Sequence, residues 1–525
     1  MFRKSFDSPV ALVILAGASV FLAFPKFNLW PLVLLFPLFA IHLNACVTSV
    51  RRAFLAGFWV SCVIMLGGFY WVTYVIHNFG FLPWSVSGLL FAGFCGFGAL
   101  NFPVSAAVTY AVDRRWGVSQ NTRLAPIWWI VVYPAFFTLI EWLIPKLFPW
   151  HIGHCLYHTS WLNQIAEVTS TPFLTFLLLS TGAALTVVCY PPAGAVKATR
   201  RWLATPAGLT ALTIVFSLVR LAQGPAHEKT LRVGVVQANI GTVDKVEAAH
   251  GFVNKLHYIN ALYIRMTDEL MSQKPQLIVW PETAMVYHLH TQRDLPLEIE
   301  SRVKAWNVPL VTGAFATALK NPLTEFNAGY LLEPQPDGTV TYDYYPKNVL
   351  LAFGEYMPFG ETFPILYRLF PEVSNFEAGK TQRPLVLRDG TRLGVSICYE
   401  MIVPSFMRKV AAQGVHVLVN ITNDSWFGPT AEPYLHGALS VFRAIEHRVP
   451  IVRSTNTGTS FVVDTLGRVS GMTPVYGADS FVEEIGMPGS PPHTIYGLFG
   501  DWFVAVCAVV GFVFMIRVKR EAIHH

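Results

Sequence analysis

Hydrophobic residues are distributed unevenly along the chain, and their pattern divides it into three parts. Residues 9–222 consist largely of long apolar runs, residues 231–488 have the mixed pattern of an ordinary folded domain, and residues 497–516 are apolar again. A run of about 20 apolar residues can cross a bilayer as a helix. Runs near this length lie at residues 9–24, 28–45, 53–77, 86–112, 124–144, 172–190, 203–222 and 497–516. We therefore predict a polytopic α-helical membrane domain over residues 1–222 and a C-terminal transmembrane helix at 497–516, about eight spans in all.

The middle part of the chain alternates between strand-like and helix-like patterns. Leu231 to Asn239 is a strand pattern, His250 to Met271 fits an amphipathic helix, and Gln276 to Trp280 is a short buried-strand run. Further strand-like runs lie at residues 309–315, 327–332, 339–345, 392–397, 415–421, 450–454 and 460–464, with a long helix predicted at 434–448. Such alternation is typical of sheets packed against helices. We predict an α/β domain over residues 231–488.

Lysine and arginine gather in every second connection between the predicted spans. Because these residues concentrate on the cytoplasmic side of short connections, they orient the chain. The basic groups are Arg3 and Lys4; Arg51 and Arg52; Arg114, Arg115 and Arg123; Lys197, Arg200 and Arg201; and Arg517, Lys519 and Arg520. The opposite connections carry only Lys26 and Lys146 before the soluble domain. We predict cytoplasmic termini and residues 231–488 outside the cytoplasm, which in a two-membrane bacterium means spans in the inner membrane and this domain in the periplasm.

The composition supports the membrane prediction and accounts for the positive charge. Hydrophobic residues make up 53% of the chain and charged residues 13%, with a mean hydropathy of +0.44, a balance that soluble enzymes rarely have. The formal net charge of +6 is mostly explained by the basic connections, so we expect no nucleic-acid binding.

A cysteine stands where the strand-like run at 392–397 ends. A side chain at a strand end is held by the sheet and faces the loops, so Cys398 is suited to be a nucleophile. The alternative is a buried core cysteine, since free cysteine is among the most buried residue types. The other six cysteines lie in or beside the predicted spans, at Cys46, Cys62, Cys95, Cys155, Cys189 and Cys507.

Two other strand-like runs are followed by ionisable residues. Glu282 follows the run at 276–280, and Lys347 follows the run at 339–345. A thiol needs a base to become a thiolate, and the adduct that it forms on an acyl carbon needs a cation or N–H donors beside its oxygen. Glu282 and Lys347 have the chemistry for these two roles, which favours Cys398 as a nucleophile.

The order of these motifs resembles the Glu-Lys-Cys triad of the nitrilase superfamily, whose members share an αββα sandwich and act at carbon–nitrogen or acyl bonds. The residues that carry the resemblance are Trp280-Pro281-Glu282, Pro346-Lys347 and Ile397-Cys398-Tyr399-Glu400. Three further motifs are similar to those of the apolipoprotein N-acyltransferases, a membrane branch of this superfamily. These motifs are Phe353-Gly354-Glu355-Tyr356, Asn423-Asp424-Ser425-Trp426-Phe427-Gly428 and Arg453-Ser454-Thr455-Asn456. The resemblance extends over most of the chain.

The resemblance implies a role for each residue and requires neither a cofactor nor a metal. Cys398 is the nucleophile, Glu282 is the general base and later the acid, and Lys347 stabilises the oxyanion together with the backbone N–H after the cysteine. Glu355 orients the lysine and the base. Tyr399, Glu400, Trp426 and Trp280 are the expected surround of the site. From pattern alone, Glu400 equally fits a helix cap and Trp280 equally fits a core aromatic.

One loop departs from the pattern of this family. The chain has Gly241 after Gln237-Ala238-Asn239-Ile240, where the family often has proline, and Val246 where the family often has tryptophan. We therefore do not expect the substrate contacts of this loop to carry over unchanged.

The resemblance implies a two-step acyl transfer. Cys398 takes a fatty acyl group from a phospholipid, and the free α-amine of a diacylglyceryl-modified apolipoprotein then attacks the thioester. One alternative is a membrane-anchored nitrilase-like amidohydrolase that uses water; another is a transporter or binding protein with an inactive external domain. The many spans favour substrates that live in lipid. The few charges within them, with Glu141 as an exception near a span end, argue against an ion path.

Two segments between the predicted elements have unusual patterns. Residues 357–370 are strongly apolar for a connection, and we predict that this arm dips into the outer leaflet and opens over the site; the alternative is a loop that packs in the core. His151, His154, Cys155 and His158 share a spacing that metals use, but the interleaved aromatic residues are typical of an interfacial belt. We therefore predict no metal there.

Overall fold

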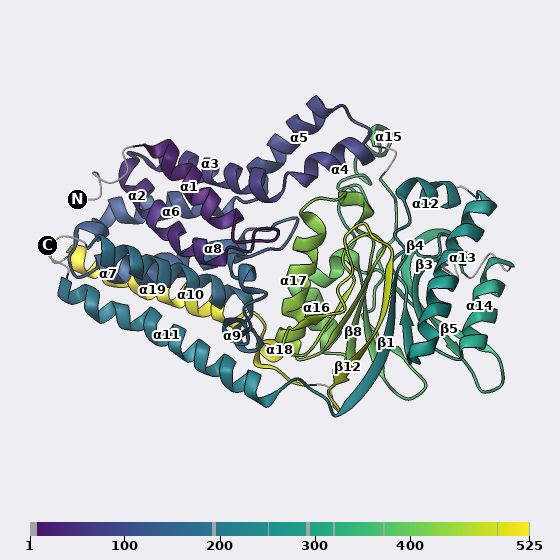
Figure 1. Cartoon of the computed structure of the whole chain (residues 1–525). Helices are drawn as coiled ribbons and strands as arrows, with labels where there is room; N and C mark the ends of the chain where they lie inside the picture. Colours follow the sequence, from purple (N-terminus) through teal and green to yellow (C-terminus); the bar gives the residue numbers. More distant parts are fainter. Residues whose placement is uncertain are drawn as a thin grey trace. The chain divides into compact units, whose positions relative to one another are not determined.

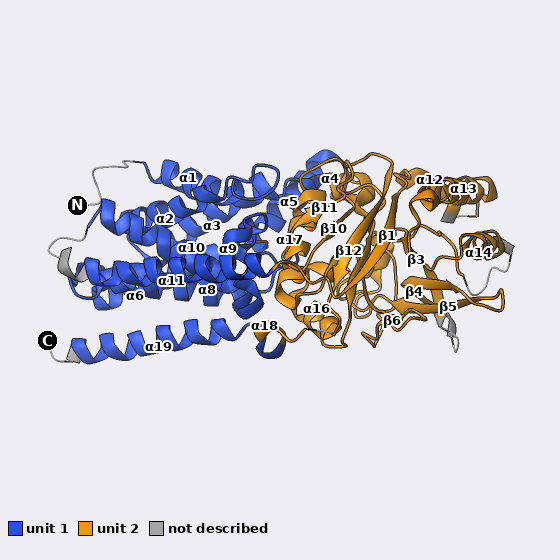
Figure 2. Ribbon diagram, turned by 60° about the horizontal axis from the view of Figure 1, so that its bottom comes forward, with its two compact units in different colours: residues 1–73, 83–223, 498–525 blue, residues 74–82, 224–497 orange. Residues whose placement is uncertain are grey.

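A computed structural model describes residues 8–191, 196–249, 251–289, 294–318, 321–370, 373–490 and 492–523. The chain forms two compact units, which Figure 2 distinguishes by colour. Unit 1 comprises Met1–Thr73, Pro83–Gln223 and Leu498–His525, and unit 2 comprises Tyr74–Leu82 and Gly224–Gly497. Arg3 and Lys4, which belong to the first predicted cytoplasmic group, lie outside the described residues.

Unit 1 is helical, as its long apolar runs predict (Figure 1). Its α-helices are α1 (Pro9–Phe21), α2 (Phe36–Cys46), α3 (Val50–Gly68), α5 (Trp84–Phe97), α6 (Asn101–Trp116), α7 (Ala125–Ile127), α8 (Tyr133–Leu143), α9 (Ser160–Asn163), α10 (Ala166–Cys189), α11 (Val196–Gln223) and α19 (Trp502–Ile523). The described segments long and apolar enough to cross a membrane are Val50–Gly68, Trp84–Trp116, Ala125–Leu143, Ala166–Cys189, Arg200–Gln223 and Trp502–Glu521. Shorter apolar helical segments, Pro9–Phe21 and Trp30–Cys46, precede them. The predicted apolar helical region is confirmed.

The predicted span at 53–77 is two helices in the structure. α3 ends at Gly68, and α4 (Trp71–Phe79) begins after a short turn. Gly67 and Gly68 are adjacent, and glycine is about 1 kcal/mol less favourable than alanine in a helix. Residues 74–82 then belong to unit 2. The apolar pattern continues through this break, which is why hydrophobicity alone overestimated the length of the span.

Glu141, the acidic residue near a span end, is part of a hydrogen-bonded network within unit 1. Its Oε1 accepts from the backbone N of Ile152 at 3.0 Å, and its Oε2 accepts from Thr175 Oγ1 at 3.0 Å. Lys146 Nζ lies 3.7 Å from the same carboxylate and donates to the Trp150 carbonyl at 2.6 Å. A buried charge is tolerated when it is paired and hydrogen-bonded in this way. Glu141 therefore anchors the connection that follows α8.

The histidines of that connection also have protein partners. His151 donates from its backbone N to His154 Nδ1 at 2.9 Å, and His151 Nδ1 lies 3.0 Å from Thr171 Oγ1. His151 precedes a short buried 3-10 helix, η5 (Ile152–Leu156), and His154 lies within it. Both histidine side chains are thus engaged in local packing and hydrogen bonding.

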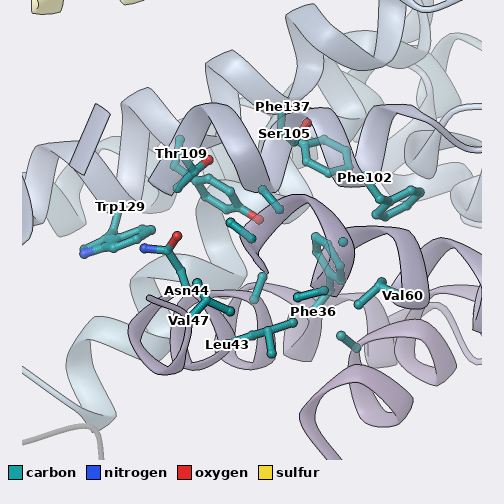
Figure 3. A pocket seen from close by; sticks show the side chains of 17 residues that line it. Phe36, Leu43, Asn44, Val47, Val60, Phe102, Ser105, Thr109, Trp129 and Phe137 are labelled. Carbon is teal, nitrogen blue, oxygen red and sulfur yellow. The ribbon is translucent and has the colours of Figure 1, made fainter. Parts of the chain in front are cut away.

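Unit 1 contains a small hollow between α1, α2, α3, α6 and α8 (Figure 3). Its walls are mainly aliphatic and aromatic, and the labelled polar side chains are Asn44, Ser105 and Thr109. The described residues that line it include no Asp, Glu, Lys, Arg, His or Cys. The hollow therefore lacks the groups needed for acyl chemistry, and the predicted reactive residues all belong to unit 2.

Unit 2 is built on two six-stranded sheets. The first sheet has the order β12-β1-β2-β3-β4-β5, and the second has the order β11-β10-β9-β8-β7-β6. The strands of the first sheet are β1 (Lys229–Gln237), β2 (Leu277–Val279), β3 (Leu310–Ala318), β4 (Asn321–Pro334), β5 (Val340–Pro346) and β12 (Asp479–Met487). Those of the second are β6 (Leu385–Val386), β7 (Arg392–Ile397), β8 (Val417–Thr422), β9 (Ile451–Thr455), β10 (Phe461–Val463) and β11 (Val469–Ser470). β1, β2 and β3 run parallel, as do β7, β8 and β9.

The two sheets pack face to face and carry helices on their outer faces (Figure 1). α13 (Val253–Leu270) and α14 (Asp294–Trp306) pack on the first sheet, and α17 (Glu432–His447) packs on the second beside α16 (Pro404–Ala411). The sheets meet through the pairs β1–β9 and β4–β7. This α–β–β–α order confirms the predicted nitrilase-like sandwich.

Candidate active site

The three predicted reactive residues each follow a strand. Glu282 comes after β2, Lys347 after β5 and Cys398 after β7, so the first two come from one sheet and the cysteine from the other. All three side chains are buried. Because the two sheets face each other, residues far apart in the sequence are collected at one end of the sandwich.

Lys347 is the centre of a buried charge cluster. Its Nζ lies 2.8 Å from Glu355 Oε1 and 3.4 Å from Glu282 Oε1. Asn327, a residue of β4, donates from Nδ2 to the same two carboxylates at 3.0 and 2.6 Å. The lysine and the amide thus hold the two acids in fixed positions. Asn327 was missed in the sequence because a polar residue within a strand pattern has no local mark of function.

The charged groups of this cluster shift one another's pKa values. Burial raises the pKa of Glu282, although Lys347 acts in the opposite direction. Burial also opposes the charge of Lys347, but Glu355 and Glu282 outweigh it and raise the lysine pKa. Burial, reinforced by Glu282, raises the pKa of the Cys398 thiol well above its usual value, against the effect of Lys347. At neutral pH the lysine is therefore a cation, and the thiol keeps its proton until a base removes it.

The backbone is strained at Cys398 and directly after Glu282. Cys398 has a φ of 51°, and Thr283, the residue after Glu282, has a φ of 48°. Residues other than glycine rarely adopt this left-handed region, and such strain is found most often at functional sites. A Cβ on Gly313 would lie 2.4 Å from the backbone N of Thr283, so this glycine lets the Glu282 turn lie against β3. The local strain at the thiol and at the acid marks this end of the sandwich.

Glu400 joins the cysteine strand to the lysine loop. Its carboxylate accepts from Ile397 N at 2.8 Å, Asn348 N at 2.6 Å, Val349 N at 3.0 Å and Tyr345 Oη at 2.9 Å. Burial raises its pKa to about 7, although these hydrogen bonds act against the shift. Glu400 therefore caps the turn after β7, as one prediction stated, and also binds the loop of Lys347 beside it.

Tyr399 and Trp280, two other residues predicted to surround the site, differ in how deeply they are buried. Tyr399 is half-buried, and burial together with Tyr356 raises its pKa to about 12. Trp280 is completely buried, stacks on Tyr263 with ring centroids 4.9 Å apart, and donates from Nε1 to Thr267 Oγ1 at 2.9 Å. It therefore lies in the hydrophobic core under α13, where the core-aromatic alternative predicts it.

Trp426 lies at the surface of unit 2 against residues from a distant part of the chain. It is 41% exposed, and its ring centroid is 4.5 Å from that of Phe79. A Cβ on Gly428 would lie 2.5 Å from the ring of Tyr74, so the segment 74–82 packs closely on the loop that carries Trp426. This long-range contact has no signal in the local sequence pattern.

Two further buried residues contact the reactive groups and were not predicted. Lys245 of α12 (Thr242–Ala249) donates from Nζ to the carbonyls of Glu282 and Thr283 at 3.3 and 3.0 Å. Burial lowers its pKa to about 7, against the pull of Glu282. His436 of α17 lies beside Cys398, with Nε2 at 3.3 Å from the cysteine carbonyl oxygen. Neither a lone lysine nor a lone histidine is distinctive in a single sequence.

Cys398, Asp424 and His436 offer ligand-type atoms within 4.8 Å of one another. Thiol, carboxylate and imidazole are also the ligands of zinc sites. Here the two oxygens of Asp424 already have partners, Oδ1 with His436 Nδ1 at 2.9 Å and Oδ2 with Arg453 Nη2 at 3.0 Å. The guanidinium beside the carboxylate disfavours a second cation, so the arrangement is better suited to holding protons than a metal.

Comparisons with known proteins match both parts of the chain. The carbon-nitrogen hydrolase family matches residues 232–478, and the apolipoprotein N-acyltransferase N-terminal domain matches residues 16–184. The apolipoprotein N-acyltransferase of Bdellovibrio bacteriovorus is 32% identical over 97% of this chain and 94% of its own length. That of Geobacter metallireducens is 30% identical, with 98% and 96% covered. Among solved structures, an amidase from Nesterenkonia sp. AN1 is similar at 18% identity and a TM-score of 0.36, over 52% of this chain and 98% of the amidase chain.

Proposed function

This chain belongs to the apolipoprotein N-acyltransferase family, and from that premise we propose that it acylates apolipoproteins. It transfers a fatty acyl group from a membrane phospholipid to the free α-amine of the N-terminal diacylglyceryl-cysteine. The observation that carries the chemistry is the Lys347 cation held between two carboxylates, with its charge acting on a thiol at a strained strand end. This arrangement suits the attack of sulfur on an acyl carbon.

In the first step, Cys398 Sγ attacks the acyl carbon of a phospholipid ester. Glu282 takes the thiol proton and delivers it to the glycerol oxygen as the C–O bond breaks, so that an acyl thioester and a lysophospholipid result. Lys347 and the backbone N–H of Tyr399 stabilise the oxyanion of the tetrahedral adduct. Glu355, at 2.8 Å from Lys347 Nζ, keeps the ammonium in place.

In the second step, the neutral α-amine of the lipoprotein attacks the thioester. Glu282, ionised after the first step, takes a proton from the attacking nitrogen. The C–S bond breaks, an amide is released, and the thiol of Cys398 is restored. Each proton that Glu282 accepts is therefore passed on within the cycle, and the chemistry requires no redox partner.

The exposed arm of unit 2 supports a lipid donor. Phe359 is 76% exposed and Phe363 is 57% exposed, and α15 (Ile365–Leu369) continues this apolar surface. Large exposed apolar patches are typical of surfaces that meet membranes or partners. The segment follows Glu355 directly in the chain, which favours the outer leaflet as the source of the acyl group over the alternative of a core-packed loop.

The apolar helices and the bacterial relatives indicate a bacterial membrane protein. We propose further that the spans lie in the inner membrane with both termini in the cytoplasm and unit 2 in the periplasm. The distribution of basic residues supports this orientation. It would bring the thiol to the side on which exported lipoproteins arrive.

A membrane-anchored amidohydrolase remains the second candidate because it would use the same three residues. In that case water replaces the amine as acceptor. The relatives that match nearly the whole chain are named N-acyltransferases, which favours the amine.

The proposal is tested by measuring the intact mass of the purified full-length protein after incubation with vesicles of a palmitoyl phospholipid. We expect the mass of one palmitoyl group to be added and then removed by neutral hydroxylamine. Cys398→Ala should show no addition, whereas Cys95→Ala, which replaces a buried cysteine of unit 1, should be acylated like the wild type. Hydroxylamine-labile acylation that persists in Cys398→Ala would place the nucleophile elsewhere.

A further inference from the structure

Both ring nitrogens of His436 face hydrogen-bond acceptors, but a neutral ring has only one N–H to donate. Nδ1 lies 2.9 Å from Asp424 Oδ1, and Nε2 lies 3.3 Å from the carbonyl oxygen of Cys398. Both partners are oxygen acceptors, but a neutral imidazole has a single N–H. One of the two contacts therefore lacks a hydrogen bond until the ring gains a second proton.

The charges around the ring decide which nitrogen carries the proton. Burial opposes ionisation of Asp424, but Arg453 and His436 outweigh it and lower the pKa of this carboxyl. Burial, together with Arg453, lowers the pKa of His436 against the effect of Asp424. At neutral pH a neutral ring thus faces a carboxylate, which is the stronger of its two acceptors. The proton lies on Nδ1, and the lone pair of Nε2 faces the backbone of Cys398, 3.3 Å from its carbonyl oxygen.

The imidazole ring of His436 lies close to the reactive sulfur. Cys398 Sγ, a ring nitrogen of His436 and a carboxylate oxygen of Asp424 are within 4.8 Å of one another, and all three residues are buried. Catalytic contacts of this kind are often longer than a hydrogen bond before substrate binds. A base turned to a nucleophile and oriented by a carboxylate is a recurrent arrangement for activating a thiol or hydroxyl.

We propose that His436, oriented by Asp424, is a second proton acceptor for the thiol of Cys398, used when Glu282 already carries a proton. The S–H bond breaks, the proton moves to Nε2, and the electron pair stays on sulfur as the thiolate. The imidazolium then donates to both oxygens that face it, Asp424 Oδ1 and the Cys398 carbonyl. This inference rests on the proposed function, in which the thiolate is acylated.

Proton transfer remains balanced over the cycle. Glu282 starts with its own proton, gives it to the leaving glycerol oxygen, and recovers one from the attacking amine. His436 keeps the thiol proton while sulfur is acylated and while it leaves again as a thiolate. Free enzyme is thereby restored with both protons in their starting positions, and no co-reactant is consumed.

The other charged groups around the ring are Glu432 and Arg453. Glu432, one turn earlier in α17, has Oε1 at 3.7 Å from Nδ1, and burial together with Asp424 raises its pKa well above the usual value. Burial thus disfavours the carboxylate form of Glu432, and Asp424, at 2.9 Å, is the nearer acceptor for the Nδ1 proton. Arg453, from β9, neutralises the other oxygen of Asp424 at 3.0 Å. Burial and Arg453 oppose the imidazolium, whereas the carboxylate of Asp424 and a thiolate at Cys398 stabilise it by their opposite charge.

The test is the rate at which iodoacetamide alkylates Cys398 in the purified full-length protein without lipid, followed on the Cys398 peptide by mass spectrometry. His436→Asn is made in the wild type and in Glu282→Gln, because asparagine retains a donor near Nδ1 but has no basic nitrogen. The matched control is His447→Asn, which changes another buried histidine of α17.

In the Glu282→Gln background at neutral pH, we expect His436→Asn to slow alkylation on the order of tenfold or more and to shift the pH profile upward. His447→Asn should change the rate less than about twofold. Equal, small effects of both histidine changes would overturn the proposal. If His436→Asn unfolds the protein, Asp424→Asn in the same background gives the answer: the upward pH shift is expected, and an unchanged profile overturns the proposal.

This assay separates the inference from the function on which it rests. Alkylation requires no phospholipid, so a His436 effect in a protein that never forms an acyl thioester would refute the proposed function and leave the proton acceptor intact. Thioester formation in the wild type, together with an unchanged alkylation rate in His436→Asn, would support the proposed function and refute His436 as a proton acceptor.

Discussion

Replacing Lys347 with methionine removes the cation between two buried carboxylates while nearly preserving the shape of the side chain. Lys347 is 1% exposed, and its Nζ is 2.8 Å from Glu355 and 3.4 Å from Glu282. Removing one partner of a buried pair costs roughly 3–5 kcal/mol because the other charge stays buried without compensation. Since each kcal/mol lowers Tm by about 2–4 °C in a domain of this size, we expect the Tm of unit 2 to fall by roughly 6–20 °C.

The loss of stability in Lys347→Met should depend on pH. Burial already raises the pKa of Glu282 in the folded protein, and Lys347 opposes that rise, so its removal raises this pKa further. A carboxyl whose pKa is raised on folding binds more protons in the folded state than in the unfolded state. Stability therefore falls as pH rises from the unfolded pKa through the folded pKa. The difference in Tm between wild type and variant should be larger near pH 8 than near pH 5.

Differential scanning fluorimetry of the full-length protein at the two pH values measures this effect. The control is Lys304→Met, because Lys304 pairs with Glu300 at the same 2.8 Å but the two side chains are 41% and 24% exposed. An exposed pair contributes less than about 1 kcal/mol, so this variant should barely change Tm. Equal losses in the two variants, or a Lys347→Met loss that is the same at both pH values, would refute the reasoning.

Three further predictions concern other parts of the chain. Glu400→Ala leaves three backbone N–H groups without their acceptor, at roughly 1–3 kcal/mol each, so thermal unfolding should show a large loss of stability together with loss of thioester formation. Phe359→Ser with Phe363→Ser should slow acylation from vesicles with little change in Tm, because both side chains are exposed; a large fall in Tm would instead show core packing. A reporter active only in the periplasm should be active when fused after Ala222; activity after Arg52 or Arg201 instead would contradict the orientation.

The elements of unit 2 were predictable wherever burial leaves a periodic pattern. β7 and β8 are buried along nearly their whole length, so their short apolar runs stand out from the polar turns around them. β12 was not predicted because this edge strand is mostly half-exposed and carries charges, and only its pairing with β1 defines it. Local pattern thus predicts the inner strands better than the edges of the sheet.

The candidate site was predictable in its charged residues but not in their supports. Glu282 and Cys398 follow apolar strands, and that position is visible in the sequence. Asn327 and His436 lie inside a strand and a helix, and their roles arise from contacts across 45 and 38 residues of chain. The packing of Phe79 on Trp426 likewise joins segments that the apolar pattern had separated. Such contacts depend on the tertiary fold, and a short stretch of sequence does not contain the information needed to predict them.

The most direct test of the account is a single-turnover chase of the acyl enzyme. Protein acylated from a palmitoyl phospholipid is freed of donor and mixed with a synthetic peptide that begins with diacylglyceryl-cysteine, and mass spectrometry follows both partners. We predict that the thioester disappears as an amide on the peptide α-amine appears in equal amount, and that an N-acetylated peptide leaves the thioester intact. Release of free palmitate at the same rate with either peptide would contradict the account and identify a hydrolase.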